Sequence, residues 1–249
     1  MIKVTLPDGS VREYEQGIML YEVARSISEG LARNTLGAVV NGQTRGLQET
    51  LNEDSEIKFV NFEDPEGKAI FWHTSAHIMA LAVQRLYPDV KFAIGPAIDD
   101  GFYYDFDTEH RFTPEDLEAI ENEMKKIVRE GHELVRTEMQ REDAIAHFEP
   151  MGEVYKVDLI TNLPEGATIS FYTLGDFIDL CKGPHLKDIS KVKAVKLMSK
   201  LDREDAVLVV LGGAGSTKTL TTLRDKIVKE TSLKVAAFTV TENLGASGD

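Results

Sequence analysis

The stretch from Ile70 to Val83 constrains the fold of this chain more than any other. It is apolar in a helical pattern, and His73 and His77 interrupt it four residues apart. On a helix, residues four apart lie one turn above each other on the same face. We therefore expect a buried helix over residues 68–86, from which both imidazoles point at one metal ion, water molecule or substrate atom.

A second couple with the same spacing, Cys181 and His185, follows further along the chain. Imidazole and thiolate groups are ligands that zinc prefers, so four would complete a tetrahedral site and three would leave room for water. Without a metal, a histidine with a pKa of about 6.5 can take a proton from water and return it to a leaving group. The plain alternative is that these side chains only fill the core. Thr74 replaces the glutamate of the His-Glu-x-x-His pattern, which disfavours peptidase chemistry.

Length and charge limit the classes of protein to which this chain can belong. The chain has 249 residues, which is room for one large or two modest domains. A net charge of −14 argues against DNA or bulk nucleic acid as a partner, although a local basic patch can still bind RNA. No apolar run is long enough to span a membrane. The single cysteine rules out an internal disulfide and predicts a cytoplasmic protein.

Residues 1–62 carry the signals of a small β-grasp-like domain. In order, these are a hairpin at 3–14, a helix at 19–27 that ends near Gly30, a turn at Asn41 and Gly42, and an alternating strand at 56–60. The acidic segment Glu63–Gly67 contains proline and glycine, so it is a predicted linker.

Residues 63–200 predict a larger α+β domain. After the histidine helix, a hairpin joins residues 92–97 to 101–106. Thr113 and Asp116 have the spacing of a helix N-cap and its partner, and Gly131 ends that helix. A shorter helix is predicted at 141–148 and a strand at 168–172. Separated strands and helices favour α+β over repeating βαβ units.

Residues 201–249 have the pattern of an unplaced βαβ-like tail. A strand at 206–211, a glycine-rich loop at 212–219, a helix at 220–230 and a strand at 234–240 are predicted. The loop resembles a phosphate loop around Lys218, but Thr217 replaces the second glycine and only 30 residues follow Thr219. A structural βαβ fragment is therefore favoured over a nucleotide site.

Several short motifs occur in a fixed order between residues 5 and 198. They are Thr5–Ser10, Val40–Gly42, His73–His77, Ala93–Pro96, Gly101–Asp105, Tyr155–Val157, Asp179–His185 and Lys196–Met198. With them the chain resembles the amino-terminal region of bacterial-type threonyl-tRNA synthetases. The resemblance implies a TGS-like β-grasp domain at 1–62 and an editing, or aminoacyl-tRNA deacylase, domain at 63–200. It stops before the tail.

The implied activity is hydrolysis of serine from mischarged Ser-tRNA(Thr), without the aminoacylation core. A pocket gains only about 1–3 kcal/mol from one methyl group, so separating threonine from serine requires a second site. This chain alone is expected to act as an ester hydrolase and not as a ligase. Two other interpretations stay open: a non-catalytic RNA-binding or regulatory module, and a zinc-dependent hydrolase.

The resemblance also assigns roles to residues. His73 and Lys156 are implied to handle water and protons, and the implied substrate-binding residues are His77, Tyr104, Asp179, Cys181 and His185. Editing is implied to need no cofactor, so zinc at His73, His77, Cys181 and His185 is a second interpretation. By residue type alone, Lys156 fits a surface position and Tyr104 a core position.

Six lysines between residues 182 and 200 reverse the acidic character of the chain. They are Lys182, Lys187, Lys191, Lys193, Lys196 and Lys200, with Asp188 as the one acid among them. Lysines contact phosphates without reading sequence. They are predicted to hold the acceptor end of the tRNA; the alternative is a solvated basic edge.

Overall fold

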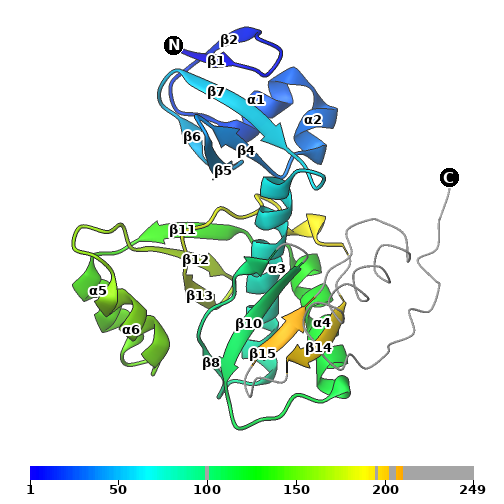
Figure 1. The fold of residues 1–249 in the computed structure, drawn as a ribbon, viewed down its shortest axis with the longest axis vertical. Coiled ribbons are helices and arrows are strands. Elements are labelled where there is room, and N and C mark those ends of the chain that lie inside the picture. Colours follow the sequence, from blue (N-terminus) through cyan, green and yellow to red (C-terminus); the bar gives the residue numbers. More distant parts are fainter. Residues whose placement is uncertain (99–100, 194–195, 202–205, 210–249) are drawn as a thin grey trace, which may run out of the picture.

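One long helix, α3 (Pro65–Leu86), connects two units of an α+β structure (Figure 1). The computed structural model describes residues 1–98, 101–193, 196–201 and 206–209. Of the predicted tail, the loop at 212–219, the helix at 220–230 and the strand at 234–240 lie outside the described residues. Its first strand begins as β15 (Ala206–Val209), which pairs within the sheet of the second unit.

The first unit is a five-stranded sheet that holds one face of a helix. The strand order is β2 (Val11–Tyr14), β1 (Ile2–Thr5), β7 (Ser55–Val60), β4 (Gly37–Val40), β5 (Gln43–Gly46), and β1 runs parallel to β7. A two-stranded ladder joins β3 (Ile18–Met19) to β6 (Thr50–Leu51). Helix α1 (Leu20–Ile27) buries Leu20 and Val23 in one core with Val4 and Ile57. This is the β-grasp arrangement, and the predicted hairpin and turn are confirmed.

The predicted helix end at Gly30 is wrong. Helix α1 ends at Ser28, and a second helix, α2 (Glu29–Asn34), contains Gly30. Ser28 is extended, and its hydroxyl accepts a hydrogen bond from the Leu31 amide at 2.9 Å. An N-cap of this kind begins a new helix, so the serine and not the glycine sets the boundary.

The predicted linker at 63–67 is confirmed only for residues 63 and 64, because α3 begins at Pro65 and includes Gly67. Proline suits the first turn of a helix, where its missing N–H is not needed. A Cβ at Gly67 would lie 1.9 Å from the Asn61 carbonyl oxygen, so only glycine allows the chain to double back there. Further along the helix, Ile70 packs closely on Gly37 of the first unit. A Cβ at Gly37 would lie 2.3 Å from Cδ1 of Ile70. The two units are therefore joined by a packed helix.

The second unit surrounds the middle of α3. Its larger sheet has the order β14 (Leu197–Leu201), β15, β10 (Gly101–Asp107), β8 (Lys91–Phe92), and β9 (Ala97–Ile98) also pairs with β10. Helix α4 (Pro114–Glu130) packs along α3. The predicted capping box of Thr113 and Asp116 is present, and Gly131 ends the helix with φ of 70°. Residues 70–83 of α3 are buried apart from the half-buried His73, so polar groups in this part of the helix face other side chains instead of solvent.

A three-stranded sheet completes the second unit. It consists of β11 (Leu134–Glu138), β12 (Ser170–Leu174) and β13 (Phe177–Leu180), with α5 (Arg141–Phe148) and α6 (Val154–Asn162) beside it (Figure 1). A short 3-10 turn, η1 (Ile189–Lys191), follows. The Arg141 guanidinium donates to the carbonyls of Ile160, Thr161, Leu163 and Pro164, which holds the end of α6. Among the described residues, no helix is both long and apolar enough to cross a membrane.

Candidate functional site

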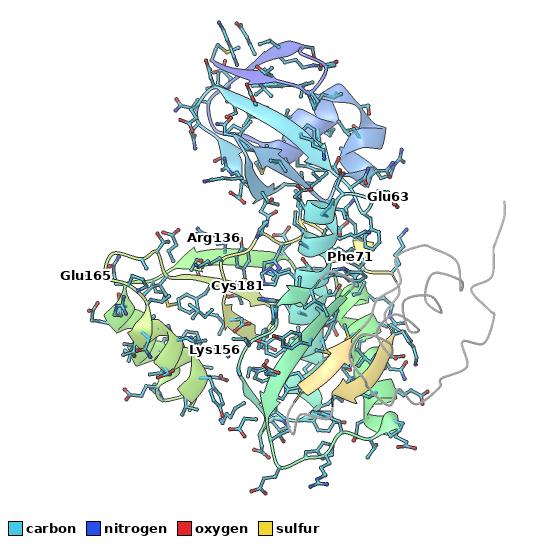
Figure 2. The ribbon with its side chains drawn as sticks, in the orientation of Figure 1. Glu63, Phe71, Arg136, Lys156, Glu165 and Cys181 are labelled. Atoms are coloured by element: carbon cyan, nitrogen blue, oxygen red, sulfur yellow. The ribbon has the colours of Figure 1, made fainter. Side chains whose placement is uncertain are left out.

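The two sequence couples meet beside α3. The ligand atoms of His73, His77, Cys181 and His185 all lie within 4.8 Å of one another. Helix α3 carries the two histidines, and the segment directly after β13 carries Cys181 and His185. His77, Cys181 and His185 are buried and His73 is half-buried. Figure 2 shows Cys181 beside α3, with Lys156 on the side of α6. We name these four residues the histidine–cysteine cluster.

The thiol of Cys181 is at the centre of this cluster. Its Sγ lies 3.2 Å from Nε2 of His73 and 3.2 Å from Nε2 of His185, and it accepts a hydrogen bond from the Gly183 amide. Gly183 has φ of 71°, and a Cβ there would lie 2.3 Å from the Tyr172 hydroxyl. The left-handed turn and the close tyrosine both require glycine, so the local sequence directs Cys181 and His185 toward α3.

A second group of polar side chains borders the cluster. The Lys156 side chain is 1% exposed, and its ammonium donates to Glu153 at 2.8 Å and lies 3.6 Å from Asp179 Oδ1. It also lies 5.5 Å from the ring centre of Phe92 and 5.7 Å from that of Phe177. Two carboxylates and two aromatic faces therefore surround a single buried cation.

Asp179 connects the two groups. One of its oxygens accepts a hydrogen bond of 2.6 Å from the Tyr104 hydroxyl and lies 3.8 Å from Nε2 of His77. Alternation along β13 places Asp179 on the buried side, where β12, β10 and α3 converge. A Cβ at Gly95 would lie 2.2 Å from the Tyr104 ring, so a glycine is needed to seat that tyrosine.

Burial controls the protonation of the cluster. It lowers the pKa of His73 and of His77 to about 3, with a contribution to the first from His77 and to the second from Lys156. Burial also lowers the pKa of His185 well below its usual value and raises that of Cys181 to about 12. At neutral pH the three imidazoles are therefore uncharged and the thiol keeps its proton. The close approach of His77 to Asp179 is then no ion pair.

Asp179 is subject to opposing influences. Burial raises its pKa, while the Lys156 charge and the Tyr104 hydrogen bond act in the other direction. One atom nearby has no partner: Nδ1 of His77 is buried without a hydrogen bond among the described residues. Buried polar atoms are nearly always satisfied, so this nitrogen marks a position for a water molecule or a ligand.

The described part of the structure brings three of the six predicted tRNA-binding lysines together. These three, Lys187, Lys191 and Lys193, line a groove of about 590 Å³ together with Tyr21, Arg33 and His132. Lys187 lies 5.0 Å from the Tyr21 ring centre, and the Lys191 ammonium donates to the Arg33 carbonyl. Because Tyr21 and Arg33 belong to the first unit, this groove runs between the two units.

Lys182 and Lys196 do not line this groove. Lys182 is exposed next to Cys181. Lys196 pairs with Glu121 at 2.9 Å. The backbone of Lys200 belongs to β14, and its side chain is outside what the structure describes. Sequence reasoning missed Glu153, which precedes Lys156 by three residues and contacts its ammonium. That spacing is a signal on a helix, but helix α6 itself was not predicted.

Comparisons with known proteins agree with this architecture. Residues 2–61 match the TGS domain, and residues 169–209 match the threonyl and alanyl tRNA synthetase second additional domain. Over 199 residues, 80% of the chain, it is 59% identical to the threonine–tRNA ligase of Finegoldia magna and 56% identical to that of Clostridioides difficile. The threonine–tRNA ligase of Acetivibrio thermocellus is 57% identical over the same length. The chain spans 31% of the length of these curated relatives, in their amino-terminal part.

Proposed function

We propose that this chain, which carries the TGS and editing domains of the threonyl-tRNA synthetase amino-terminal region, hydrolyses the ester of mischarged Ser-tRNA(Thr). The observation that supports this most is the convergence of the histidine–cysteine cluster with Lys156, Asp179 and Tyr104. These residues come from α3, α6, β10, β13 and the segment after β13. A lone thiol suits a reducing compartment, so we place the reaction in the cytoplasm.

The charges near Asp179 suit an aminoacyl ester. Lys156 is nearer to Glu153, at 2.8 Å, than to Asp179, at 3.6 Å. One ammonium thus faces two carboxyl groups, and Asp179 keeps hydrogen-bonding capacity for another cation. The α-ammonium of the seryl group would supply it. Pairing with a ligand cation would also favour the charged form of Asp179, against the effect of burial.

Ester hydrolysis needs a positioned water and donors for the charge that develops on oxygen. A neutral imidazole such as His73 can accept a hydrogen bond from that water. The Lys156 ammonium is a donor for the developing oxyanion or the leaving ribose hydroxyl. The unpartnered Nδ1 of His77 offers a place for the water or the serine hydroxyl. In this proposal the reaction depends on the geometry of side chains around the ester.

The acceptor end of the tRNA is the proposed partner. Lys182 stands beside the cluster, and the groove with Lys187 and Lys193 leads between the two units. Lysines supply affinity for phosphates without reading the sequence. Such contacts can hold the acceptor stem of the tRNA whichever amino acid it carries.

The test is release of serine from Ser-tRNA(Thr) by the chain and by its H73A variant. The matched control is H147A, because His147 is exposed on α5 and outside the cluster. We expect H73A to lose most of the activity and H147A to keep it. Equal activity of H73A and the unchanged chain would remove His73 from the reaction, and an inactive chain that binds tRNA would favour the non-catalytic RNA-binding interpretation.

A zinc-dependent hydrolase is a second candidate, because the ligand types fit zinc. Bonds of about 2.0–2.3 Å to zinc place tetrahedral ligand atoms about 3.3–3.8 Å apart. The cluster spans up to 4.8 Å, while Cys181 Sγ lies 3.2 Å from two of the imidazole nitrogens, so binding would draw some ligand atoms together and move the sulfur slightly away from those two nitrogens. His73, His77, Cys181 and His185 would hold the ion, and Cys181 would lose its proton on binding. Bound zinc supplies Lewis-acid chemistry, but four protein ligands leave no position for water. Elemental analysis of the purified protein, with activity before and after chelation, separates the two candidates.

A further inference from the structure

Thr74 belongs to neither sequence couple, yet it contacts one of them. It is fully buried on α3, and its hydroxyl oxygen has three partners. The hydroxyl donates to the Ile70 carbonyl at 2.8 Å and accepts from the Leu186 amide at 2.9 Å. Its third partner is Nδ1 of His185, at 3.3 Å.

The number of hydrogens on the Thr74 hydroxyl determines whether it donates to or accepts from Nδ1 of His185. A hydroxyl has one hydrogen to donate and two lone pairs to accept with. A carbonyl oxygen only accepts, so the short contact with Ile70 uses the one hydrogen. The Leu186 amide takes the first lone pair, since an amide only donates. The second lone pair remains for His185, whose Nδ1 must therefore carry its hydrogen.

We infer that Thr74 is a positioning residue that fixes His185 as the Nδ1–H tautomer and leaves the lone pair on Nε2. That nitrogen faces Cys181 Sγ at 3.2 Å. The tautomer of a histidine is commonly set by the hydrogen bond that its other nitrogen makes, and here that bond comes from the helix of the first couple.

The consequence concerns His73. An unprotonated Nε2 on His185 accepts the single thiol hydrogen of Cys181, which is then directed away from His73. Because the sulfur then presents a lone pair to Nε2 of His73 at 3.2 Å, that nitrogen donates in the contact, and Nδ1 is the ring atom that can accept a hydrogen bond from water. This consequence rests on the proposed function; the tautomer itself does not. A bound metal would require the Nε2 lone pair of His185.

The tautomer can be measured by 15N NMR of the imidazole side chains in the whole chain. The His185 signals are assigned by their loss in H185Q. We expect a protonated Nδ1 and a bare Nε2 in the unchanged chain and in T74S, which keeps the hydroxyl. In T74V the Nδ1–H tautomer should give way to a mixture or to Nε2–H.

Ser75 provides a matched control. It is as buried as Thr74, and its hydroxyl donates to the Phe71 carbonyl at 2.8 Å, one residue along the same helix. S75A should leave the His185 signals unchanged. An Nε2–H tautomer in the unchanged chain would overturn the inference even if T74V failed to fold, and so would an unaltered tautomer in folded T74V.

Activity distinguishes this inference from the proposed function. Serine release should fall about 10–100-fold in T74V, the loss typical of groups that orient histidine side chains in metal sites, and should be retained in T74S. A chain with the Nδ1–H tautomer but no deacylase activity would refute the proposed function alone. An active chain in which T74V changes neither tautomer nor rate would refute the inference alone.

Discussion

The hydroxyl of Tyr104 donates to Asp179 across 2.6 Å, and both side chains are buried. This bond ties β10 to β13 and aims the Asp179 carboxyl at His77 and Lys156. Tyr104 had no role by residue type beyond that of a core aromatic. Its position instead makes it the support of Asp179, an acid that lies near both His77 and Lys156.

Tyr104→Phe should remove this support. The Asp179 carboxyl would lose its shortest hydrogen bond, its pKa would rise further, and the free energy of unfolding should fall by about 1–3 kcal/mol. Urea unfolding at pH 7 measures the loss. Tyr103→Phe is the control, because Tyr103 is the half-buried neighbour on the same strand. Equal stability of the two variants would contradict the role of the bond.

Lys156→Met should destabilise the chain by about 3 kcal/mol, because it leaves Glu153 and Asp179 without their buried cation. Adding Glu153→Gln should recover part of this loss, since one unpaired carboxylate is then gone. Serine release should stay low in both variants if the ammonium acts in the reaction. A double variant with restored activity would assign Lys156 a purely structural role.

Asp179→Asn tests recognition of the α-ammonium. The unchanged chain should hydrolyse Ser-tRNA(Thr) at least about tenfold faster than N-acetylseryl-tRNA(Thr), which lacks the α-ammonium. A hydrogen bond to a charged group contributes about 1.5–3 kcal/mol. The variant should show little difference between the two substrates. Persistence of the full preference in the variant would place the ammonium elsewhere.

The buried histidines predict a loss of stability in mild acid. The folded pKa of His77 is about 3 and the unfolded value is 6.5, so its contribution is complete above pH 6.5 and is lost as the pH falls toward 3. The free energy of unfolding should therefore drop by up to about 1.4 kcal/mol per pH unit for this residue. Urea unfolding between pH 7 and 5 measures this histidine effect. Asp116 and Glu130 have pKa values of about 2, so their protonation reduces stability mainly at lower pH. His77→Gln should flatten the slope.

The groove lysines predict a salt effect on tRNA binding. Replacing Lys187 and Lys193 by alanine should weaken binding and reduce the slope of log K against log salt by about one for each phosphate that a lysine no longer neutralises. Lys125→Ala is the control, because Lys125 is exposed on α4 and outside the groove. An unchanged slope would place the phosphates elsewhere.

Local sequence signals predicted those parts of the fold that local chemistry determines. The capping box at Thr113 depends on residues three apart, and the couples at His73 and Cys181 depend on helical or turn spacing. Helix α6 was missed because Val154, Val157 and Ile160 are β-branched and disfavour a helix. Packing against β12 and the four carbonyl contacts of Arg141 hold it instead.

The same limit applies to the site. The resemblance to known synthetases identified Lys156, but nothing in its local sequence indicates that it is buried between Phe92 and Phe177. Glu153 and Thr74 act through contacts with residues that are distant in sequence or on an unpredicted helix. Such contacts become visible only when the strands and α3 are assembled.

The close fit of Ile70 on Gly37 bears on how these two units can be exchanged between proteins. The sequence suggests residue 62 as a recombination point, because the small unit ends there. However, Ile70 of α3 packs on Gly37 of the small unit, so the contact between the units lies beyond that point. A recombined protein would inherit either Ile70 without its glycine or the glycine without Ile70. Successful exchange should therefore move the small unit together with the start of α3, so that the unit of inheritance ends inside a helix.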